Sequence, residues 1–382
     1  MTLQELHADE ALRQQEFPVT RDRVFLAHAG VCPLPHRVAE AIRGYAGQST
    51  RGDQESLLSA FLQRSRELVA GVLQAQPEEI ALVGPTSLAL SFIAGGLRFR
   101  KSDNIVVYFD DYPSNVYPWM ALADRGVEVR FLNVGQLGRI RAMDVLGQVD
   151  EATRLVALAS CHFISGYRIE LDEIGSALRK RGILFCVDGI QTVGAFPTTV
   201  QDIDFLAADA HKWMLGPCAA GILYVRKAVQ EQLRPIVFGW HNVRCPGFVA
   251  QEELAFRSGA NRYEAGTHNW LGLTGLNAAL ELLQEIGIET IATELLRKRA
   301  WLIPPLQAKG YTVLEASASA ENASGIVSFY RPNADMPSLW QRLDQAHIVT
   351  SLRSDRAGQQ YIRLSPHFYN TDAELQRVLD LL

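Results

Sequence analysis

An acid and a lysine follow two apolar runs of this chain, where they could act on one ligand. Asp188 ends the run at 183–187, and Lys212 comes soon after the run at 205–208. Pyridoxal phosphate needs such a pair, a carboxylate that keeps a proton on the ring nitrogen and an amine that forms a Schiff base with the aldehyde. A helix-capping aspartate and a solvated lysine would give the same letters, so other residues must support the interpretation.

A third motif could hold the phosphate of such a cofactor. Residues 84–87 end in Thr86 and Ser87 and precede an apolar helix predicted at 88–97. Hydroxyl groups and free backbone N–H groups at a helix N-terminus suit a phosphate. Hydroxyl residues at this position usually only cap a helix, so the motif gains its weight from the acid and the lysine.

Alternating apolar and helix-like stretches predict the elements that position these side chains. Six runs are predicted as buried strands, at 104–109, 127–133, 154–159, 183–188, 204–208 and 221–226. Continuous apolar strands separated by helices indicate a mostly parallel sheet covered on both faces, which is an α/β fold. Ligands of such sheets bind beyond the carboxyl ends of the strands, where Asp188 and Lys212 lie.

The rest of the chain predicts a smaller C-terminal domain and an N-terminal arm. Helices are predicted at 274–286 and 289–306, and short strands at 325–330 and 361–364. Pro18 interrupts the pattern of the first residues before a strand-like stretch at 24–26. We therefore expect an arm of helix and coil at 1–22 that packs on the small domain, a large cofactor-binding domain at 23–272 and a small α+β domain at 273–382.

Composition and charge exclude several classes of partner. The 382 residues are 48% hydrophobic, and the net charge is -5 with acids and bases interspersed. Without a basic stripe or a polybasic run, we expect neither nucleic acid nor membrane as a partner. The polar first residues and the absence of a long apolar run predict a soluble, cytoplasmic protein. The five cysteines are scattered, which favours reduced thiols.

Further motifs resemble a known family. They are Asp188-x-x-Gln191, His211-Lys212, Gly216-Pro217 and Gly221-x-Leu223-Tyr224. Together they resemble the class V aminotransferase family, also called cysteine desulfurase-like, of fold type I pyridoxal phosphate enzymes. The similarity extends over nearly the whole chain, because four more segments resemble the family's opening strand (25–30), ring-stacking loop (112–119), dimer-contact segment (262–267) and C-terminal substrate segment (363–371).

The resemblance implies most of a cofactor site. Thr86 and Ser87 would hold the phosphate, Tyr112 would stack on the ring, and Gln191 would contact the ring oxygen. A tyrosine offers an aromatic face to a flat heterocycle, although loop tyrosines often only pack. The full predicted cofactor set is Thr86, Ser87, Tyr112, His162, Asp188, Gln191, His211, Lys212, Gly266 and Thr267.

Some of these contacts are implied only by position in the family pattern. His162 aligns with a position where relatives place Asn or Gln near the ring oxygen, and a histidine can also donate a hydrogen bond there. His211 would lie beside the phosphate or the ring. Gly266 and Thr267 would reach the phosphate of a neighbouring subunit, so the resemblance implies a homodimer with shared active sites.

The resemblance also implies how an amino-acid substrate would be bound. Arg363 matches the arginine that clamps the substrate α-carboxylate by a two-pronged hydrogen bond, which a lysine could not replace well. His28 and Arg353 are further candidates for contacts on the substrate side. Lys212 is the predicted catalytic residue, and none of these residues is predicted to bind a metal.

Two departures from the family pattern bear on the reaction. Cysteine desulfurases carry a nucleophilic cysteine on a mobile loop shortly before the carboxylate-binding arginine, whereas residues 349–360 contain no cysteine. A persulfide relay is therefore disfavoured. Asp209 stands where relatives often have a phosphate-binding serine, and an acid there would repel a phosphate unless it turns away or binds a basic group.

We expect β-elimination at a cysteine- or cystine-like amino acid, because elimination needs no acid or base beyond Lys212. Residues 112–115 and 365–367 are most similar to isopenicillin epimerase-like and cysteine or cystine lyase-like members. Transamination and epimerisation stay open as alternatives. A catalytically silent relative that acts as a binding protein is another, but the cofactor and substrate residues that are kept together argue against it.

Overall fold

A seven-stranded sheet forms the centre of the larger domain in the computed structural model, which describes residues 1–55 and 58–382. Its strands in chain order are β2 (Ile80–Val83), β3 (Asn104–Val107), β4 (Glu128–Phe131), β5 (Thr153–Ala159), β6 (Leu184–Asp188), β7 (Phe205–Ala208) and β8 (Gly221–Val225). Their order across the sheet is β2-β8-β7-β6-β5-β3-β4. The strands from β3 to β7 run parallel, and β8 runs antiparallel to both of its neighbours. All six predicted strands are present, and the sequence pattern missed β2.

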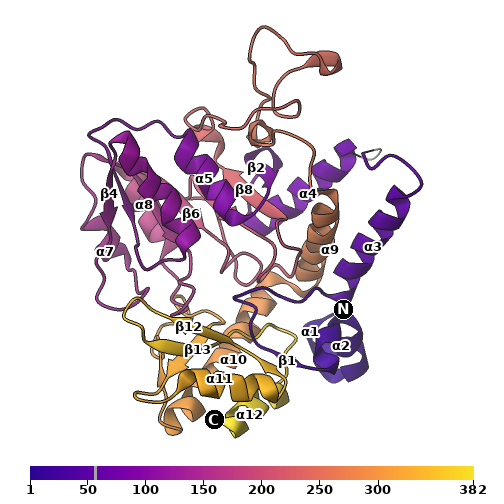
Figure 1. Ribbon diagram of the computed structural model, residues 1–382, viewed down its shortest axis with the longest axis vertical. Coiled ribbons are helices and arrows are strands. Elements are labelled where there is room, and N and C mark those ends of the chain that lie inside the picture. Colours follow the sequence, from indigo (N-terminus) through magenta and orange to yellow (C-terminus); the bar gives the residue numbers. More distant parts are fainter. Residues whose placement is uncertain (56–57) are drawn as a thin grey trace.

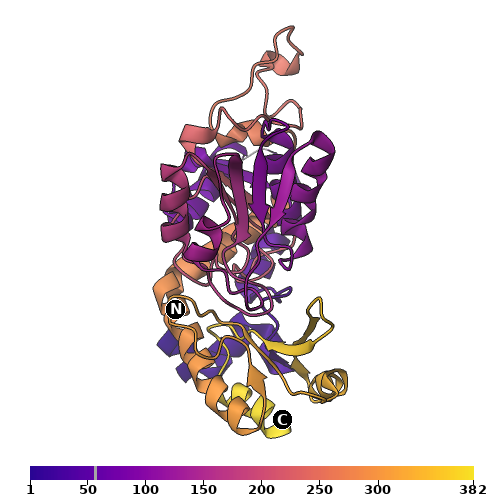
Figure 2. The same cartoon turned by 90° about the vertical axis from the view of Figure 1, so that its left-hand side faces the viewer.

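Helices cover both faces of this sheet, as the edge-on view in Figure 2 shows. They are α3 (His36–Ser49), α4 (Leu58–Leu73), α5 (Thr86–Gly96), α6 (Tyr117–Met120), α7 (Ala142–Leu146), α8 (Leu171–Lys180) and α9 (Trp270–Ile286). Alternate residues of β3 show why both faces are apolar: Val106 belongs to one buried cluster, and Ile105 and Val107 belong to another. The predicted α/β layer architecture is confirmed.

The smaller domain carries the C-terminus and lies at one end of the molecule (Figure 1). Its antiparallel sheet has the order β12-β13-β10-β9. The elements are α10 (Ile288–Ala308), β9 (Thr312–Val313), β10 (Val327–Tyr330), α11 (Met336–Gln345), β11 (Ile348–Val349), β12 (Ser351–Ser354), β13 (Gln360–Leu364) and α12 (Asp372–Leu381). The strand β1 (Val24–Phe25) pairs in parallel with β11, so the opening strand joins this domain rather than the large sheet.

The first residues form two short helices, α1 (Leu3–Ala8) and α2 (Glu10–Glu16), beside the C-terminal segment. Arg13 forms an ion pair with Glu374 at 2.8 Å, and the ring of Phe17 stacks on Tyr369 with 3.9 Å between centroids. The helix α9, which the sequence pattern placed at the start of the small domain, packs against α3 and α4. The boundary at 272/273 stays a prediction.

Short 3-10 helices connect the main elements. They are η1 (Pro18–Arg21), η2 (Pro77–Glu79), η3 (Pro113–Asn115), η4 (Ala121–Arg125), η5 (Lys227–Val229), η6 (Pro246–Phe248) and η7 (Ala260–Tyr263). Within the described residues, every helix is too short or too polar to cross a membrane.

Candidate active site

Lys212 is a buried amine without a hydrogen-bonding partner. It lies four residues beyond the end of β7, is 7% exposed, and makes no hydrogen bond or ion pair with any described residue. Its Nζ lies 5.2 Å from the centroid of the Tyr112 ring. Burial lowers the pKa of Lys212 to about 8, although the Asp188 carboxylate raises it. Such an amine is partly neutral near physiological pH and can attack an aldehyde.

Asp188 is the last residue of β6, the strand next to β7. Its backbone pairs with Ala207, so the sheet brings the acid and the lysine to the same edge. The carboxyl is buried and accepts one hydrogen bond within the described chain, from the Ile190 N–H at 3.1 Å. Burial raises its pKa, and Lys212 opposes that shift. A buried acid with free lone pairs can therefore receive a ring N–H.

The loop after β3 carries Tyr112 and is held by a second buried acid, Asp111. One oxygen of Asp111 accepts the Tyr112 N–H at 2.7 Å. The other accepts the Asn115 side-chain amide at 3.0 Å and the Ala159 N–H at 3.1 Å. Burial and then the charge of Asp188 raise the pKa of Asp111 to about 7. Asp111 therefore anchors this loop, a role that the sequence analysis does not identify.

His162 is buried, with both ring nitrogens engaged. Its Nδ1 accepts the Ser165 N–H at 3.1 Å, so the proton is on Nε2, which donates to the Asp110 carbonyl at 3.0 Å. Burial lowers the pKa of His162 to about 4, so the ring is neutral. The structure thus shows His162 supporting the loop after β3, and its contact with a cofactor oxygen stays a prediction.

Gln191 lies between two segments of the site. Its Nε2 donates to the Ala29 carbonyl at 3.1 Å, and its Oε1 accepts the Trp213 indole N–H at 2.8 Å. Because an amide nitrogen has two hydrogens, Gln191 keeps one donor for a ligand. Its contact with a cofactor ring oxygen stays a prediction.

Thr86 is the first residue of α5, and its hydroxyl has no partner. The Thr86 Oγ1 atom is buried and makes no hydrogen bond in the described chain. The preceding Pro85 cannot cap the helix with its side chain, so N–H groups of this first turn are also free of a side-chain cap. An orphaned hydroxyl at an uncapped helix N-terminus fits a phosphate. Ser87, beside it, is half-buried.

The Asp209 carboxylate accepts hydrogen bonds from its own loop. Its two oxygens accept the Ala210 N–H at 2.8 Å, the Ala219 N–H at 3.0 Å and a hydrogen bond from His211 Nδ1 at 2.8 Å. The acid that stands in place of the family's serine therefore binds a basic group and backbone N–H groups. His211 is held beside Lys212 by this contact, and its place near a phosphate stays a prediction.

Gly266 and Thr267 line a cavity of about 380 Å³ together with Gly84. Thr267 is exposed, and Gly266 is half-buried. Gly84 and Leu88, on either side of the predicted phosphate-binding residues, thus face the same cavity as the segment at 264–268, which is distant in the sequence. Whether the threonine serves a second subunit stays a prediction.

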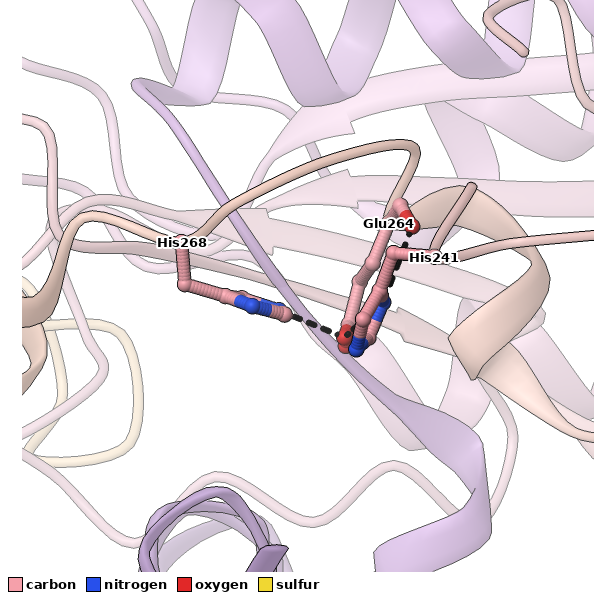
Figure 3. Close-up of side chains that lie close together, drawn as sticks. All are labelled: His241, Glu264 and His268. Carbon is pink, nitrogen blue, oxygen red and sulfur yellow. Dashed lines mark hydrogen bonds and ion pairs between the residues drawn. The ribbon is translucent and has the colours of Figure 1, made fainter. Parts of the chain in front are cut away.

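Three side chains outside the predicted cofactor set converge at this segment: His241, Glu264 and His268 (Figure 3). The Glu264 carboxylate accepts the Leu82 N–H at 2.8 Å, Arg66 at 2.6 Å and His268 Nε2 at 2.7 Å. Burial works against the charge of Glu264, but the His268 hydrogen bond and the Arg66 cation hold its pKa below the usual value.

Two histidines and a carboxylate are common zinc ligands. Here the Arg66 guanidinium already occupies the Glu264 oxygen that contacts His268, and a second cation on that oxygen would be repelled. His241 Nδ1 is also engaged, with the Glu264 carbonyl at 3.1 Å. The cluster therefore anchors the segment at 264–268 to β2.

Arg363 and Arg353 form the opposite wall of the site, on β13 and β12. Arg363 is 1% exposed and donates to the Phe163 carbonyl at 2.6 Å and to Ser351 Oγ at 3.3 Å, and its Nε has no acceptor. A Cβ atom on Gly30 would lie 3.7 Å from Arg363 Nη2 and 3.8 Å from Arg353 Nη2. Within the described residues, neither guanidinium pairs with a carboxylate, which leaves both free for an anionic ligand.

These two arginines also perturb each other. Burial and then the Arg353 charge lower the pKa of Arg363 to about 9. Bringing two cations together in a buried wall is costly unless an anion neutralises them. The pair therefore favours a negatively charged substrate.

His28 lies between the domains with both ring nitrogens bonded. Nδ1 contacts the Ser365 carbonyl at 2.9 Å, and Nε2 contacts the Tyr369 hydroxyl at 2.8 Å. The ring is fully buried, and burial lowers its pKa to about 4. This geometry gives His28 a packing role, and its predicted substrate contact stays a prediction.

The residues fit pyridoxal phosphate. An unpaired buried amine, a buried acid, an exposed aromatic face and an orphaned hydroxyl at a helix N-terminus match the aldehyde, ring nitrogen, ring face and phosphate. The orphaned Thr86 hydroxyl and the unpaired Lys212 amine are the observations that carry this fit, because buried polar groups are normally hydrogen-bonded.

Two curated relatives are similar to this chain over almost its whole length. A probable cysteine desulfurase of Methanothermobacter thermautotrophicus is 32% identical over 385 residues, which cover 95% of this chain and 94% of the relative. The uncharacterised aminotransferase YcbU of Bacillus subtilis is 26% identical over 378 residues, covering 98% and 97%.

Solved structures share the fold. An apo cysteine desulfurase from Thermococcus onnurineus has a TM-score of 0.85 at 24% identity, covering 96% of each chain. The cystine C–S lyase C-DES, solved with its product cysteine persulfide, has a TM-score of 0.87 at 23% identity, covering 95% of this chain and 98% of that one. The family model for class-V aminotransferases matches residues 24–378. The chain therefore belongs to the class-V aminotransferase family and is a pyridoxal phosphate-dependent enzyme.

Proposed function

We propose that this enzyme is a C–S lyase that cleaves a cysteine- or cystine-like amino acid without forming a persulfide on one of its own cysteines. The observation that carries the proposal is the wall of two arginines, Arg353 and Arg363, that pair with no carboxylate among the described residues and lie on a hairpin that carries no cysteine. Relatives named as cysteine desulfurases support sulfur amino acids as the substrate class.

The chain's own residues account for the acid–base chemistry of elimination. Bound pyridoxal phosphate draws electrons from the substrate α-carbon. Lys212 takes the α-proton on Nζ, and the sulfur leaves the β-carbon with the electron pair of the C–S bond. Addition of water to the remaining three-carbon unit gives pyruvate and ammonia. Cysteine thus yields hydrogen sulfide, and cystine yields cysteine persulfide.

The placement of the cysteines supports direct release of the sulfur. Cys32, Cys161 and Cys186 are buried, and burial raises the pKa of Cys161 to about 11. A buried protonated thiol is a poor nucleophile. Cys218 is exposed and Cys245 is half-buried, and neither lies on the hairpin beside Arg363.

Arg353 supports a substrate with a second anionic group. Arg363 is the candidate for the α-carboxylate, and Arg353 lies on the neighbouring strand with its guanidinium half-buried near the same glycine. Cystine has a second carboxylate that could meet Arg353, whereas cysteine does not. We expect a lower KM for cystine than for cysteine.

Product analysis tests the proposal. The holoenzyme is incubated with cystine and with cysteine, and pyruvate, ammonia, sulfide, persulfide and alanine are measured. A lyase releases one pyruvate per substrate cleaved. Alanine in place of pyruvate would overturn the proposal, because removing sulfur with its transfer to the enzyme leaves alanine. Turnover that requires an added keto acid would instead indicate transamination.

A thiol variant and a lysine control complete the experiment. The double variant Cys218→Ser, Cys245→Ser removes the two thiols that are not buried and should keep pyruvate formation unchanged. Loss of pyruvate formation in this double variant would indicate a persulfide relay. Lys227→Ala removes an exposed lysine and serves as the control for Lys212→Ala.

We also infer a homodimer with shared sites. Phe248, Val249 and Leu254 are 78%, 62% and 53% exposed on one segment between β8 and α9, which is unusual for apolar side chains unless a partner covers them. Light scattering should give twice the chain mass. Co-expression of a Lys212→Ala chain with a Thr267→Ala chain should restore one intact site per hybrid dimer, and no restoration would contradict shared sites.

A further inference from the structure

The hairpin between β12 and β13 is a rigid unit. Asp355 Oδ1 accepts the Gln359 N–H at 2.9 Å, and Asp355 Oδ2 accepts the Tyr361 hydroxyl at 2.7 Å. Gly358 has φ 81°, a left-handed conformation that favours glycine, and its N–H donates to the Asp355 carbonyl at 3.1 Å. Because these bonds fix the turn, the tip of the hairpin and the strands that carry Arg353 and Arg363 should move together.

Arg356, at the tip of this hairpin, contacts the large domain in three ways. Its Nε donates to Asp110 Oδ1 at 2.6 Å, and its Nη2 donates to the Phe109 carbonyl at 3.1 Å. Its guanidinium carbon also lies 3.7 Å from the centroid of the Phe109 ring. The Phe109 ring in turn packs on Phe131 at 4.6 Å between centroids. A planar guanidinium can bind a carboxylate, donate to a carbonyl and stack on an aromatic ring at the same time, whereas a lysine ammonium cannot.

The segment that Arg356 contacts also forms the cofactor side of the site. The Asp110 carbonyl accepts the His162 Nε2 proton, and the next residue, Asp111, fixes the backbone of Tyr112. Arg356 therefore connects the hairpin that bears the substrate arginines to the loop that bears the ring-stacking tyrosine. These two segments belong to different domains and are otherwise distant in the sequence.

We propose that Arg356 is a positioning residue: it holds the β12–β13 hairpin across the site and thereby sets the affinity for the substrate. The side chains of Arg356 and Asp110 are 54% and 34% exposed, so water and salt weaken the contact. A clasp of this kind can open for the substrate to enter. The part of the proposal that concerns affinity rests on the proposed function, and the part that concerns the hairpin does not.

Hydrogen exchange of the apoprotein tests the clasp independently of the reaction. In Arg356→Ala, amides in both 351–364 and 109–116 should exchange about two- to fivefold faster, because one contact holds both segments. Asp110→Asn keeps the carbonyl that binds His162 and should give the same pattern. Unchanged exchange in either segment of both variants would overturn the clasp.

A matched control removes a different contact between the domains. Arg139 in the large domain pairs with Glu315 in the small domain at 3.3 Å and has a side-chain exposure of 34%. Arg139→Ala should leave exchange at 351–364 as in the wild type. If it speeds exchange there as much as Arg356→Ala does, domain contacts in general hold the hairpin, and the specific role of Arg356 is wrong.

Steady-state kinetics with cystine then test the effect on affinity. Arg356→Ala should raise KM about two- to fivefold and leave kcat within twofold, and Arg356→Lys should restore part of the difference. Added salt should raise KM in the wild type more than in Arg356→Ala. A fall in kcat at unchanged KM, or no change in either, would overturn the positioning role. If neither the wild type nor any variant turns over cystine, the proposed function is wrong. The hydrogen-exchange result still tests whether Arg356 holds the hairpin.

Discussion

The cofactor side and the substrate side of this site are built differently. Asp188 ends β6 and Lys212 follows the adjacent strand β7, so the hydrogen bonds between these strands bring them together within one domain. Arg353 and Arg363 lie on an edge hairpin of the small domain, and Arg363 reaches across to the Phe163 carbonyl of the large one. Backbone ladders position the chemistry, whereas side-chain contacts between domains position the substrate. Changes on the first side should abolish reaction, and changes on the second should mainly alter affinity.

The largest effect is expected from Lys212→Ala. Without its amine the enzyme loses both the covalent attachment of the cofactor and the base at the α-carbon, so kcat should fall by roughly 10³-fold or more. The fold should persist, because Lys212 makes no hydrogen bond with any described residue. Pyruvate release from cystine measures the effect. Activity within tenfold of wild type would show that the lysine is not the base.

Arg363→Lys should have the next largest effect. A lysine keeps the charge but loses the two-pronged hydrogen bond to a carboxylate, so kcat/KM should fall by about 10- to 100-fold.

Arg353→Lys should lower kcat/KM for cystine and leave kcat/KM for cysteine unchanged, because cysteine lacks the second carboxylate. Arg154→Lys is the control, because the Arg154 side chain is 45% exposed and forms an ion pair with Asp103. Equal losses for both substrates in Arg353→Lys would contradict a second anion site.

Thr86→Val should weaken cofactor binding without harming the apoprotein. Valine has the same shape and removes a buried hydroxyl that lacks a partner, so the melting temperature of the apoprotein should stay the same or rise. Loss of a hydrogen bond to the phosphate should weaken pyridoxal phosphate binding about tenfold. Ser91→Ala, five residues further along α5, is the control. Unchanged binding in Thr86→Val would place the phosphate elsewhere.

The smallest effect is a shift in pH dependence. Because the pKa of Lys212 is lowered from 10.5 to about 8, the rate of cofactor incorporation into the apoprotein should rise through pH 8 and then level off. Between these two pKa values the unfolded chain binds the extra proton, so the stability of the apoprotein should increase with pH there. Asp188→Asn removes a charge that raises the pKa and should shift the midpoint downward. A rate that still climbs above pH 10 would contradict a buried amine.

The two sides of the site also differ in what the sequence could predict. Parallel strands buried on both faces give continuous apolar runs, so β3 and β5 to β7 were located within two residues of their ends, and Asp188 and Lys212 with them. The antiparallel direction of β8 and the strand β2 gave no such signal. The role of Asp111 as an anchor and the clasp at Arg356 depend on partners distant in the sequence, and no local pattern encodes them.

The departure at Asp209 shows the same limit in a single residue. The sequence indicated that an acid near a phosphate must turn away or bind a basic group, and the structure shows it bonded to His211 and two backbone N–H groups. The residue type was sufficient to raise the question. The answer required the loop geometry, because Ala219 is ten residues away in the chain.

Borohydride reduction followed by peptide mapping tests the central claim most directly. The holoenzyme is reduced, digested and compared with a Lys227→Ala control, which keeps the predicted site. We predict that the reduced pyridoxyl group is found on Lys212 alone and that Lys212→Ala carries no label. A label on another lysine, or none after pyridoxal phosphate has been added to the wild type, would contradict the assignment of Lys212 to the Schiff base and of Asp188 to the ring nitrogen.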